Sequence, residues 1–370
     1  MKKLLLVILA LFTLSTVEAA KKPIKIIFDT DMGNDVDDVI ALDMLYKYQD
    51  EGTIDLLGIL SSKREGGSVK FIDAMNTLYG YPNIPIGIAK IYPEENYVDT
   101  ATSKRLNYAD YVVANNTYKH TVKNWDAIPD GYKLLRQLLA KEEDKSVVVV
   151  AVGFSTNLAR MMESKGDEFS PLGGKELFAQ KVEKVVIMAG NFAEARAEYN
   201  VHKDHFAAVK FYAECPVPMY FTDYLLGRTI LYPWQCIYKG YNYVENHPCV
   251  KAFEYYQQMP YNRPLWDPTA VLFAAEPNGG YASISKPGMV QVDFKSQTYF
   301  IEDKASNRHY YIVNDKQRAK IIRRVEEICE PKTGMVLNLA MNYGGRAEIT
   351  RAMKTLASRV EKGELKAEDI

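Results

Sequence analysis

An acidic stretch near the amino terminus has the residue types and the spacing best suited to chemistry. Five aspartates fall within ten positions, namely Asp29, Asp31, Asp35, Asp37 and Asp38. Carboxylates this close together either share a cation or raise one another's pKa. A hard divalent cation takes about six to eight oxygen ligands from carboxylates, carbonyls and water. The stretch is therefore a candidate cation site in which a carboxylate can act as a general base.

Simpler explanations account for only part of this stretch. Asp35, Asp37 and Asp38 could complement the dipole of a helix that begins here, an effect of about 0.3–1 kcal/mol per charge. An EF-hand loop is excluded, because Ile40 stands where the bidentate glutamate is needed. Phosphoaspartyl phosphatases also open with two aspartates, one residue apart, after an apolar strand. That alternative stays open, although Gly33 does not suit it.

The surrounding chain alternates between predicted strands and helices. Residues 25–28 predict a short buried strand, and apolar residues recur at helical spacing from Val36, with Asn34 or Asp35 as the cap. Further strands, separated by helices, are predicted at 54–60, 84–88, 146–152, 182–188 and 217–221. Three strands within 289–313 read as antiparallel. The pattern indicates an α/β fold: a mostly parallel, Rossmann-like open sheet covered by helices, with a small antiparallel addition near the C-terminus.

Polar residues gather where the predicted parallel strands end. The first strand ends at Asp29 and Asp31, and a glycine-containing turn follows another at Gly153. A polar loop comes after the strand at 182–188, and a Trp-Asp pair lies further along at Trp266. Open α/β sheets bind ligands at the carboxyl ends of their strands. We therefore expect these four sets of residues to meet at one edge of the sheet.

The ends of the chain are predicted to differ from its middle. Residues 1–20 have a basic start, a short apolar core and a small-residue end, as a secretory signal peptide does. We therefore expect a secreted or periplasmic protein, and no cysteine stands where a lipid anchor would be attached. Residues 21–345 are predicted to form a single catalytic domain, and residues 346–370 a charged tail or peripheral helix.

Composition narrows the range of partners. The formal net charge is −1 and no basic block occurs, which argues against a nucleic-acid polymer. The apolar core of the signal is too short to span a membrane, so no stable membrane insertion is expected. Four cysteines without a paired C-x-x-C spacing argue against zinc and against a disulfide scaffold, although one bridge is compatible with them. A small molecule is the expected partner.

Four motifs, in the same order along the chain, resemble those of the calcium-dependent nucleoside hydrolases of the inosine-uridine preferring type. They are Asp29-Thr30-Asp31-Met32-Gly33 with Asp37-Asp38, Val152-Gly153-Phe154-Ser155-Thr156-Asn157-Leu158-Ala159, Glu198-Tyr199-Asn200, and Trp266-Asp267-Pro268. The likeness covers roughly residues 24 to 330, and four ordered motifs are more specific than any single one. The resemblance also implies a homo-oligomer and a nucleoside or related ribosyl substrate.

The resemblance implies a role for each matched residue. Ca2+ would be held by Asp31, Asp38, Asp267 and the main-chain carbonyl of Val152. Asp31 would also be the catalytic base that takes a proton from the attacking water. The substrate would be contacted by Asp37, Asn191, Glu198, Asn200 and Trp266. Direct attack by water on an oxocarbenium-like transition state would invert the anomeric centre.

Three departures from the family pattern qualify these roles. The acidic motif has two extra residues, Asn34 and Asp35 or thereabouts, so either Asp35 or Asp37 could bind the ribose diol; we favour Asp37. The loop 61–67 lacks the asparagine that usually contacts the sugar. Trp266 replaces a histidine often proposed to protonate the leaving base. An indole cannot supply that proton, but it can stack on a purine, as in the purine-specific branch. Three histidines, His202, His205 and His247, are available, and none of them is assigned as the acid that protonates the leaving base.

These observations favour calcium-dependent hydrolysis of the N-glycosidic bond of a nucleoside, with purines modestly preferred, to give base and ribose. Two alternatives remain. The first is a non-catalytic periplasmic protein that binds ribose or another sugar through calcium, and the second is a hydrolase of another N-glycoside on the same scaffold. At single residues, Trp266 could be part of the core. Asp267, before Pro268, could be only a helix cap.

Overall fold

The computed structural model describes residues 22–64, 66–90, 107–330, 353, 356–363 and 366. Contacts divide the chain into two units, Met1–Pro331 and Lys332–Ile370. The predicted signal at 1–20 lies outside the described residues, and so does most of the predicted tail at 346–370. Every predicted site residue lies in the first unit. Within the described part, no helix is long and apolar enough to cross a membrane.

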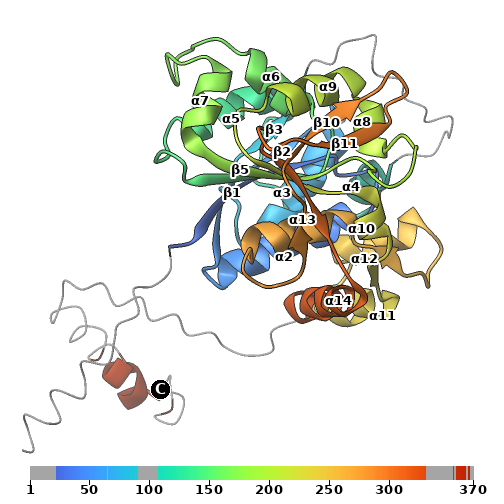
Figure 1. Cartoon of the computed structure of the whole chain (residues 1–370). Coiled ribbons are helices and arrows are strands. Elements are labelled where there is room, and N and C mark those ends of the chain that lie inside the picture. Colours follow the sequence, from blue (N-terminus) through green and yellow to red (C-terminus); the bar gives the residue numbers. More distant parts are fainter. Residues whose placement is uncertain are drawn as a thin grey trace, which may run out of the picture. The chain divides into compact units, whose positions relative to one another are not determined.

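A ten-stranded sheet forms the centre of the first unit (Figure 1). Neighbouring strands are parallel in the order β12 (Arg308–Ile312), β6 (Met219–Thr222), β5 (Val182–Met188), β4 (Val147–Ala151), β1 (Ile24–Thr30), β2 (Ile54–Ser61) and β3 (Ile86–Ile88). At the β12 edge, antiparallel pairing adds β10 (Gly288–Val292), β11 (Thr298–Glu302) and β9 (Ser283–Ile284). The mostly parallel sheet with a small antiparallel addition is therefore confirmed.

Helices cover both faces of this sheet. Side chains alternate along β1, so that Ile26 and Phe28 enter one core while Ile27 enters the other. The first core is closed by α2 (Asp37–Asp50), α3 (Gly66–Leu78), α4 (Tyr108–Asn115), α11 (Trp234–Gly240), α12 (Pro248–Tyr256), α13 (Trp266–Ala275) and α14 (Asp315–Cys329). The second is closed by α5 (Gly131–Leu139), α6 (Thr156–Glu163), α7 (Gly174–Lys181) and α9 (His205–Glu214). Figure 1 shows the α5 to α7 group above the sheet and α2, α13 and α14 below it.

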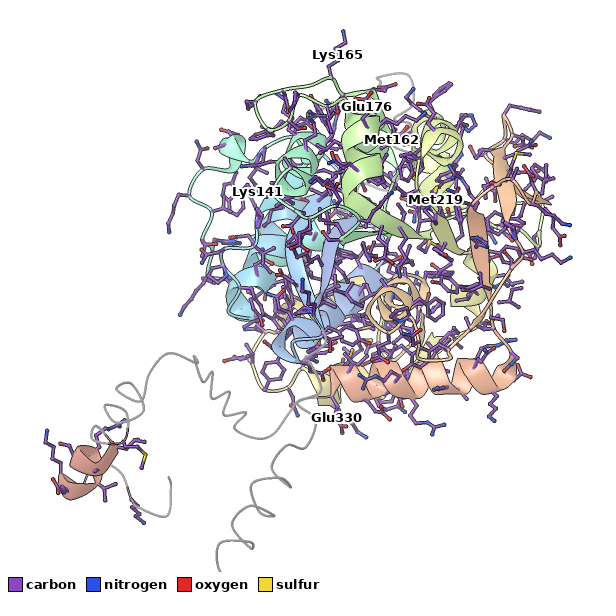
Figure 2. The ribbon with its side chains drawn as sticks, turned by 60° about the vertical axis from the view of Figure 1, so that its left-hand side comes forward. Lys141, Met162, Lys165, Glu176, Met219 and Glu330 are labelled. Carbon is purple, nitrogen blue, oxygen red and sulfur yellow. The ribbon has the colours of Figure 1, made fainter. Side chains whose placement is uncertain are left out.

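The central strands are buried on both faces, as their composition predicts. All five residues of β4 are buried and β-branched or small, which suits a strand inside a parallel sheet. Lys141, Lys165 and Glu176 are exposed, and Figure 2 shows Lys165 extending away from the ribbon. In contrast, Met162 and Met219 are buried. The loops at the carboxyl edge therefore start from strands that are packed on both faces.

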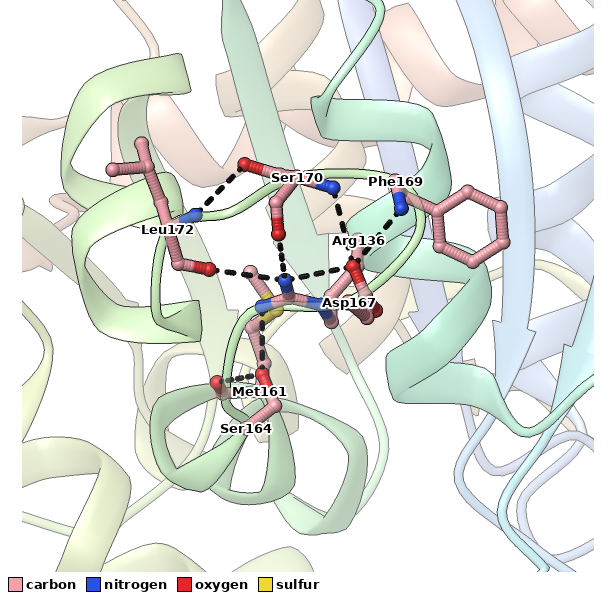
Figure 3. Close-up of polar contacts among 7 residues, drawn as sticks. All are labelled: Arg136, Met161, Ser164, Asp167, Phe169, Ser170 and Leu172. Atoms are coloured by element: carbon pink, nitrogen blue, oxygen red, sulfur yellow. Dashed lines mark hydrogen bonds and ion pairs between the residues drawn. The ribbon is translucent and has the colours of Figure 1, made fainter.

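A buried arginine fastens the loop after α6 to α5 (Figure 3). The side chain of Arg136 is fully buried, and its Nε donates to Asp167 Oδ2 at 2.6 Å. Its remaining nitrogens donate to Ser164 Oγ and to the carbonyls of Ser170 and Leu172. The hydrogen bond from Arg136 lowers the pKa of Asp167. A buried charge is tolerated here because a carboxylate and several acceptors surround it.

The starts of two helices differ from the sequence interpretation. Asn34 or Asp35 was expected to cap α2, but Val36 holds the N-cap position and its own side chain caps nothing. Asp35, one residue earlier, accepts through Oδ1 from the main-chain nitrogens of Val36 and Asp37 and also pairs with Arg263. Asp267 is not a cap either, because Leu265 holds that position in α13 and Asp267 lies in the first turn.

Candidate active site

Two turns meet closely at the carboxyl edge of the sheet. Gly33 has φ +119°, which glycine adopts without strain, and the chain turns back there after Asp31. A Cβ added to Gly153 would lie 2.5 Å from the main-chain nitrogen of Asp31 and 2.3 Å from Ser62 Oγ. Only glycine therefore allows the turn after β4 to pack against the turn after β1. This contact places Val152 beside the acidic stretch.

The structure brings together the residues predicted to bind metal. Asp31, Asp38 and Asp267 are buried, and they come from the β1 turn, α2 and α13. The main-chain nitrogen of Asp267 donates to Asp37 Oδ2 at 2.9 Å, which ties the start of α13 to the start of α2. The carbonyl of Val152 accepts a hydrogen bond of 2.7 Å from Asn200 Nδ2 and keeps a second lone pair.

Burial sets the electrostatics of this cluster. It raises the pKa of Asp37, Asp38 and Asp267 well above the ordinary range, and the charges of neighbouring aspartates raise each further. The pKa of Asp31 is raised less, to about 6, because Asn34 hydrogen-bonds to it and Lys63 is nearby. A bound cation would therefore stabilise the ionised form of these carboxylates and lower their pKa values.

Unsatisfied oxygen atoms show that the cluster suits a cation. Asp37 Oδ1 and Asp38 Oδ2 are buried and have no hydrogen-bond partner among the described residues. Thr30 Oγ1 donates to the other oxygen of Asp38. In the ranges that the structure describes, no group of three or more His, Cys, Asp or Glu side chains is arranged to hold a metal ion as it stands. The unpartnered oxygens and the all-oxygen donor set nevertheless fit a hard divalent cation.

Asp29 braces the site from behind. Its Oδ2 accepts a hydrogen bond of 3.2 Å from Asn157 Nδ2, and the same amide donates to the carbonyl of Ser61. The main-chain nitrogen of Val152 donates to the carbonyl of Asp29 at 2.7 Å. This carboxylate therefore joins the ends of β1, β2 and β4.

The loop predicted to hold the sugar is ordered by Glu198. Its carboxylate accepts hydrogen bonds from the main-chain nitrogens of Gly190, Asn200 and Val201, at 2.9 to 3.2 Å, and so caps α8 (Tyr199–Lys203). Burial raises the pKa of Glu198 to about 7. Asn191 is also buried, with its main-chain nitrogen 2.7 Å from Thr298 Oγ1. The loop thus places Asn200 against the carbonyl of Val152 and Glu198 within electrostatic reach of Asp31, while Asn191 contacts its own loop and Thr298.

Both residues of the two-residue extension have partners in the site. Asn34 Nδ2 donates to Asp31 Oδ2 at 2.6 Å, and Asn34 Oδ1 accepts from Lys63 Nζ at 2.8 Å. Asp35 forms a two-pronged pair with Arg263, which is 228 residues away in sequence. No role was predicted from the sequence for Lys63 or Arg263. Lys63 follows a strand end, which was the signal available for it, whereas nothing in the sequence links Arg263 to Asp35.

Trp266 is half-buried and held from several sides. Its Nε1 donates to the carbonyl of Tyr224 at 2.8 Å, and the two rings stack with centroids 5.7 Å apart. The Arg263 guanidinium carbon lies 5.2 Å from the Trp266 ring centroid. A Cβ on Gly227 would lie 2.3 Å from Trp266 Cδ1, so the indole packs directly on the backbone of α10 (Tyr224–Arg228). The indole ring of Trp266 is therefore held in one position next to the aspartate cluster.

Two of the unassigned histidines have structural roles. His247 is buried, and its Nδ1 accepts a hydrogen bond from the main-chain nitrogen of Cys249 at the start of α12. Its Nε2 lies 3.0 Å from Tyr243 Oη. His205 contacts Ser296 Oγ through Nδ1. Neither contact involves the aspartate cluster.

At the carboxyl edge of the parallel sheet, buried carboxylates lie beside asparagine side chains that can hold a sugar, an arrangement suited to metal-assisted hydrolysis of a glycoside. Residues 26–329 match the family model described as inosine-uridine preferring nucleoside hydrolase. The chain belongs to this family and is an N-ribohydrolase that cleaves the N-glycosidic bond of nucleosides.

Solved structures of similar proteins have the same fold. A plant nucleoside hydrolase has a TM-score of 0.63 and 16% sequence identity, over 83% of this chain and 99% of its own. A purine-preferring ribonucleoside hydrolase from Gardnerella vaginalis has a TM-score of 0.62 and 17% identity, over 83% of this chain and 99% of its own. At such low identity, the likeness shows the fold alone.

The end of the chain resembles a different family. A model described as putative undecaprenyl diphosphate synthase matches residues 312–370. A ditrans,polycis-undecaprenyl-diphosphate synthase from Aliivibrio fischeri is 49% identical over 51 residues, which is 14% of this chain and 20% of that enzyme. The chain thus spans only about a fifth of this curated relative. This likeness begins at Ile312, the last residue of β12, runs through α14 and continues into the second unit.

Proposed function

We propose that the protein hydrolyses nucleosides in a calcium-dependent reaction and favours purine nucleosides modestly, releasing the base and ribose. The observation that carries this proposal is the pair of unpartnered, buried oxygens on Asp37 and Asp38 beside Asp31. Buried carboxylates that repel one another, each with one oxygen left without a hydrogen bond among the described residues, are costly unless a cation neutralises them. Asp31, Asp38, Asp267 and the carbonyl of Val152 would hold Ca2+, whose preferred ligands are oxygens.

Each residue around the aspartate cluster has a separate role in the proposed reaction. A divalent cation bound there would polarise water and the ribose diol. Asp31 would take the proton of the attacking water as general base. Asp37 accepts from the ribose diol, while Asn191, Glu198 and Asn200 hold the rest of the sugar. The bond from water to the anomeric carbon forms as the bond to the base breaks, with inversion.

The preference for a purine base is supported by Trp266. The indole is fixed by its hydrogen bond to Tyr224 and remains partly exposed. Stacking on a flat, extended base gains more contact area for a purine than for a pyrimidine. We further propose, from the predicted signal at 1–20, that the protein works outside the cytoplasm, and from the family resemblance that it forms homo-oligomers.

The decisive experiment uses the purified full chain with inosine, adenosine, guanosine and uridine, and measures reducing sugar with and without a chelator. Chelation should abolish release, and added Ca2+ should restore it. Asp31→Asn should lower kcat by about a hundredfold to ten-thousandfold, the usual contribution of a general base. Asp55→Asn, an exposed position on β2, is the matched control and should leave turnover unchanged.

Binding measurements distinguish the hydrolase from a sugar-binding protein. Calcium-dependent binding of ribose without cleavage of any nucleoside or other N-glycoside would show that the proposed reaction is wrong. Cleavage that survives complete removal of divalent metal would contradict the calcium proposal alone.

A further inference from the structure

Two exposed arginines share one aromatic ring at the rim of the site. The guanidinium carbon of Arg196 lies 4.9 Å from the ring centroid of Tyr224, and that of Arg228 lies 5.7 Å from it. Arg196 Nη1 also donates to Tyr224 Oη at 3.1 Å. Neither arginine forms an ion pair with a carboxylate in the described part of the chain. The rim therefore carries two positive charges with no anion to balance them.

Tyr224 holds these charges at a defined place. Its main-chain nitrogen donates to the carbonyl of Gly190 at 2.8 Å, at the start of the sugar loop. Its carbonyl accepts from Trp266 Nε1, and its ring stacks on the indole. Tyr224 thus links the loop that holds the sugar to the wall beside the base. Arg196 itself lies on that loop, between Asn191 and Glu198.

Two acidic residues close in sequence to these arginines, Asp223 and Glu194, form hydrogen bonds with other groups. Asp223 caps α10 by accepting from the main-chain nitrogen of Leu226, and it also accepts from that of Phe192. Glu194 Oε2 lies 3.4 Å from Asn191 Nδ2. The guanidinium pair is therefore available to an anion that comes from outside the protein.

The chemistry of the substrate indicates where such an anion would lie. Under the proposed function, on which this step rests, the ribose diol faces Asp37 and the metal ligands, and the anomeric carbon faces the attacking water. The remaining polar group of the sugar is the 5′-hydroxyl. It must then face Asn191, Glu198 and Asn200, on the loop that carries Arg196. A substituent on that hydroxyl extends toward the arginines.

We infer that Arg196 and Arg228 bind a phosphate carried on the 5′ oxygen, so that the substrates include 5′-phosphorylated ribonucleosides. Guanidinium groups match phosphate oxygens in charge and in forked geometry, and stacking on an aromatic ring orients the fork. The phosphate can be the terminal group of a mononucleotide or part of a diphosphate such as that of ADP-ribose. The two arginines recognise the same group in both.

The test compares kcat/KM for inosine, inosine 5′-monophosphate and ADP-ribose in the full chain and in Arg196→Gln, Arg228→Gln and the double variant. Each single change should lower kcat/KM for the phosphorylated substrates about tenfold or more, mainly through KM, as expected for losing a hydrogen bond to a charged group. Inosine turnover should stay within about twofold. Arg323→Gln, an exposed arginine on α14, is the control and should change neither.

A binding experiment separates this inference from the proposed function. Calorimetry should show that ribose 5-phosphate binds more tightly than ribose, and that the double variant abolishes the difference. If inosine is cleaved but both sugars bind equally, the phosphate site is wrong and the hydrolase stands. If no nucleoside is cleaved and ribose 5-phosphate still binds through the arginines, the hydrolase is wrong and the phosphate site stands. Equal losses for inosine and its monophosphate in the variants would also overturn the phosphate site.

Discussion

Asn34 and Asp35 show how a short extension is built into a catalytic motif. Asn34 bridges Asp31 and Lys63, while Asp35 pairs with Arg263 beside Trp266. Each added residue therefore connects the acidic stretch to a basic side chain, Lys63 for Asn34 and Arg263 for Asp35. The position of Asp37, whose Oδ2 accepts from the main-chain nitrogen of Asp267, agrees with the preference for Asp37 over Asp35 as the diol ligand, which stays a prediction.

At the scale of single residues, Gly227 tests the role of Trp266. Gly227→Ala should push the indole away, because the new Cβ would lie 2.3 to 2.7 Å from atoms of Trp266. Overpacking of this kind costs about 1–3 kcal/mol of stability. We expect kcat/KM to fall more for inosine than for uridine, measured in parallel assays.

Gly66→Ala provides the matched control for this change. A Cβ at Gly66, in the first turn of α3, would meet nothing within 4 Å. The variant should retain both activities and its stability. If Gly227→Ala lowers inosine and uridine turnover equally, Trp266 does not discriminate between purine and pyrimidine.

At the scale of elements, the residue types along the chain were enough to predict the strands. They were not enough to predict the contacts between elements that are distant in sequence. The β-branched run at 146–152 predicted β4 because such residues suit a buried parallel strand. Val36 and Leu265 were not predicted as the N-cap residues of α2 and α13, because neither has a side chain that can accept a capping hydrogen bond. The ion pair between Asp35 and Arg263 spans 228 residues, so no local pattern could reveal it.

The start of α12 should make stability depend on pH. Burial lowers the pKa of His247 to about 4, with Asp43 and Lys47 acting in opposite directions. The pKa of His247 in the folded state lies below its value in the unfolded state. The contribution of neutral His247 to the free energy of unfolding is therefore complete above about pH 6.5 and is lost as the pH falls toward 4. The shift corresponds to about 3 kcal/mol at most.

His247→Asn isolates this effect, because asparagine can still accept the capping hydrogen bond from Cys249. Chemical denaturation at several pH values should show a smaller loss of stability between pH 7 and pH 4.5 in the variant than in the natural protein. Parallel losses in the two proteins would mean that His247 does not titrate within this range.

At the scale of the whole molecule, the acidic cluster should couple stability to divalent metal and to pH. The folded pKa values of Asp37, Asp38 and Asp267 are raised, so their repulsion destabilises the metal-free fold at neutral pH and is relieved as protons bind. Ca2+ at a hundredfold excess over its Kd should add about 2.7 kcal/mol. Thermal melts should show a larger increase in Tm at pH 8 than at pH 5.5.

Asp38→Asn tests the same coupling without metal. The amide oxygen can still accept from Thr30, while the charge that repels Asp31 is removed. The variant should melt at a higher temperature than the natural protein in chelator, and Ca2+ should no longer raise its Tm. Sodium chloride at equal ionic strength is the control. A Ca2+ effect of the same size at both pH values would contradict competition between protons and metal.

The sequence motifs pointed to the carboxyl edge of the sheet because their residues follow strand ends, and parallel strands bring their ends to one edge; the roles of these residues stay predictions. Lys63, Arg263 and the arginines on Tyr224 were not found, since their positions depend on how loops fold over that edge. The likeness of residues 312–370 to undecaprenyl diphosphate synthases was not found either. That likeness can be seen only by comparison with the other family, because no hydrophobic periodicity or motif spacing in residues 312–370 indicates it.

The buried Arg136 has a consequence for proteolysis. Lys165 is exposed on the loop that follows α6, where trypsin would be expected to cut. That loop is tied through Asp167, Ser170 and Leu172 to a guanidinium inside the fold. A protease needs several residues of extended, detached chain, so cleavage at Lys165 requires the arginine to lose its partners. The site should therefore be cut only as fast as the layer of α5, α6 and α7 opens, which makes it a reporter of that opening.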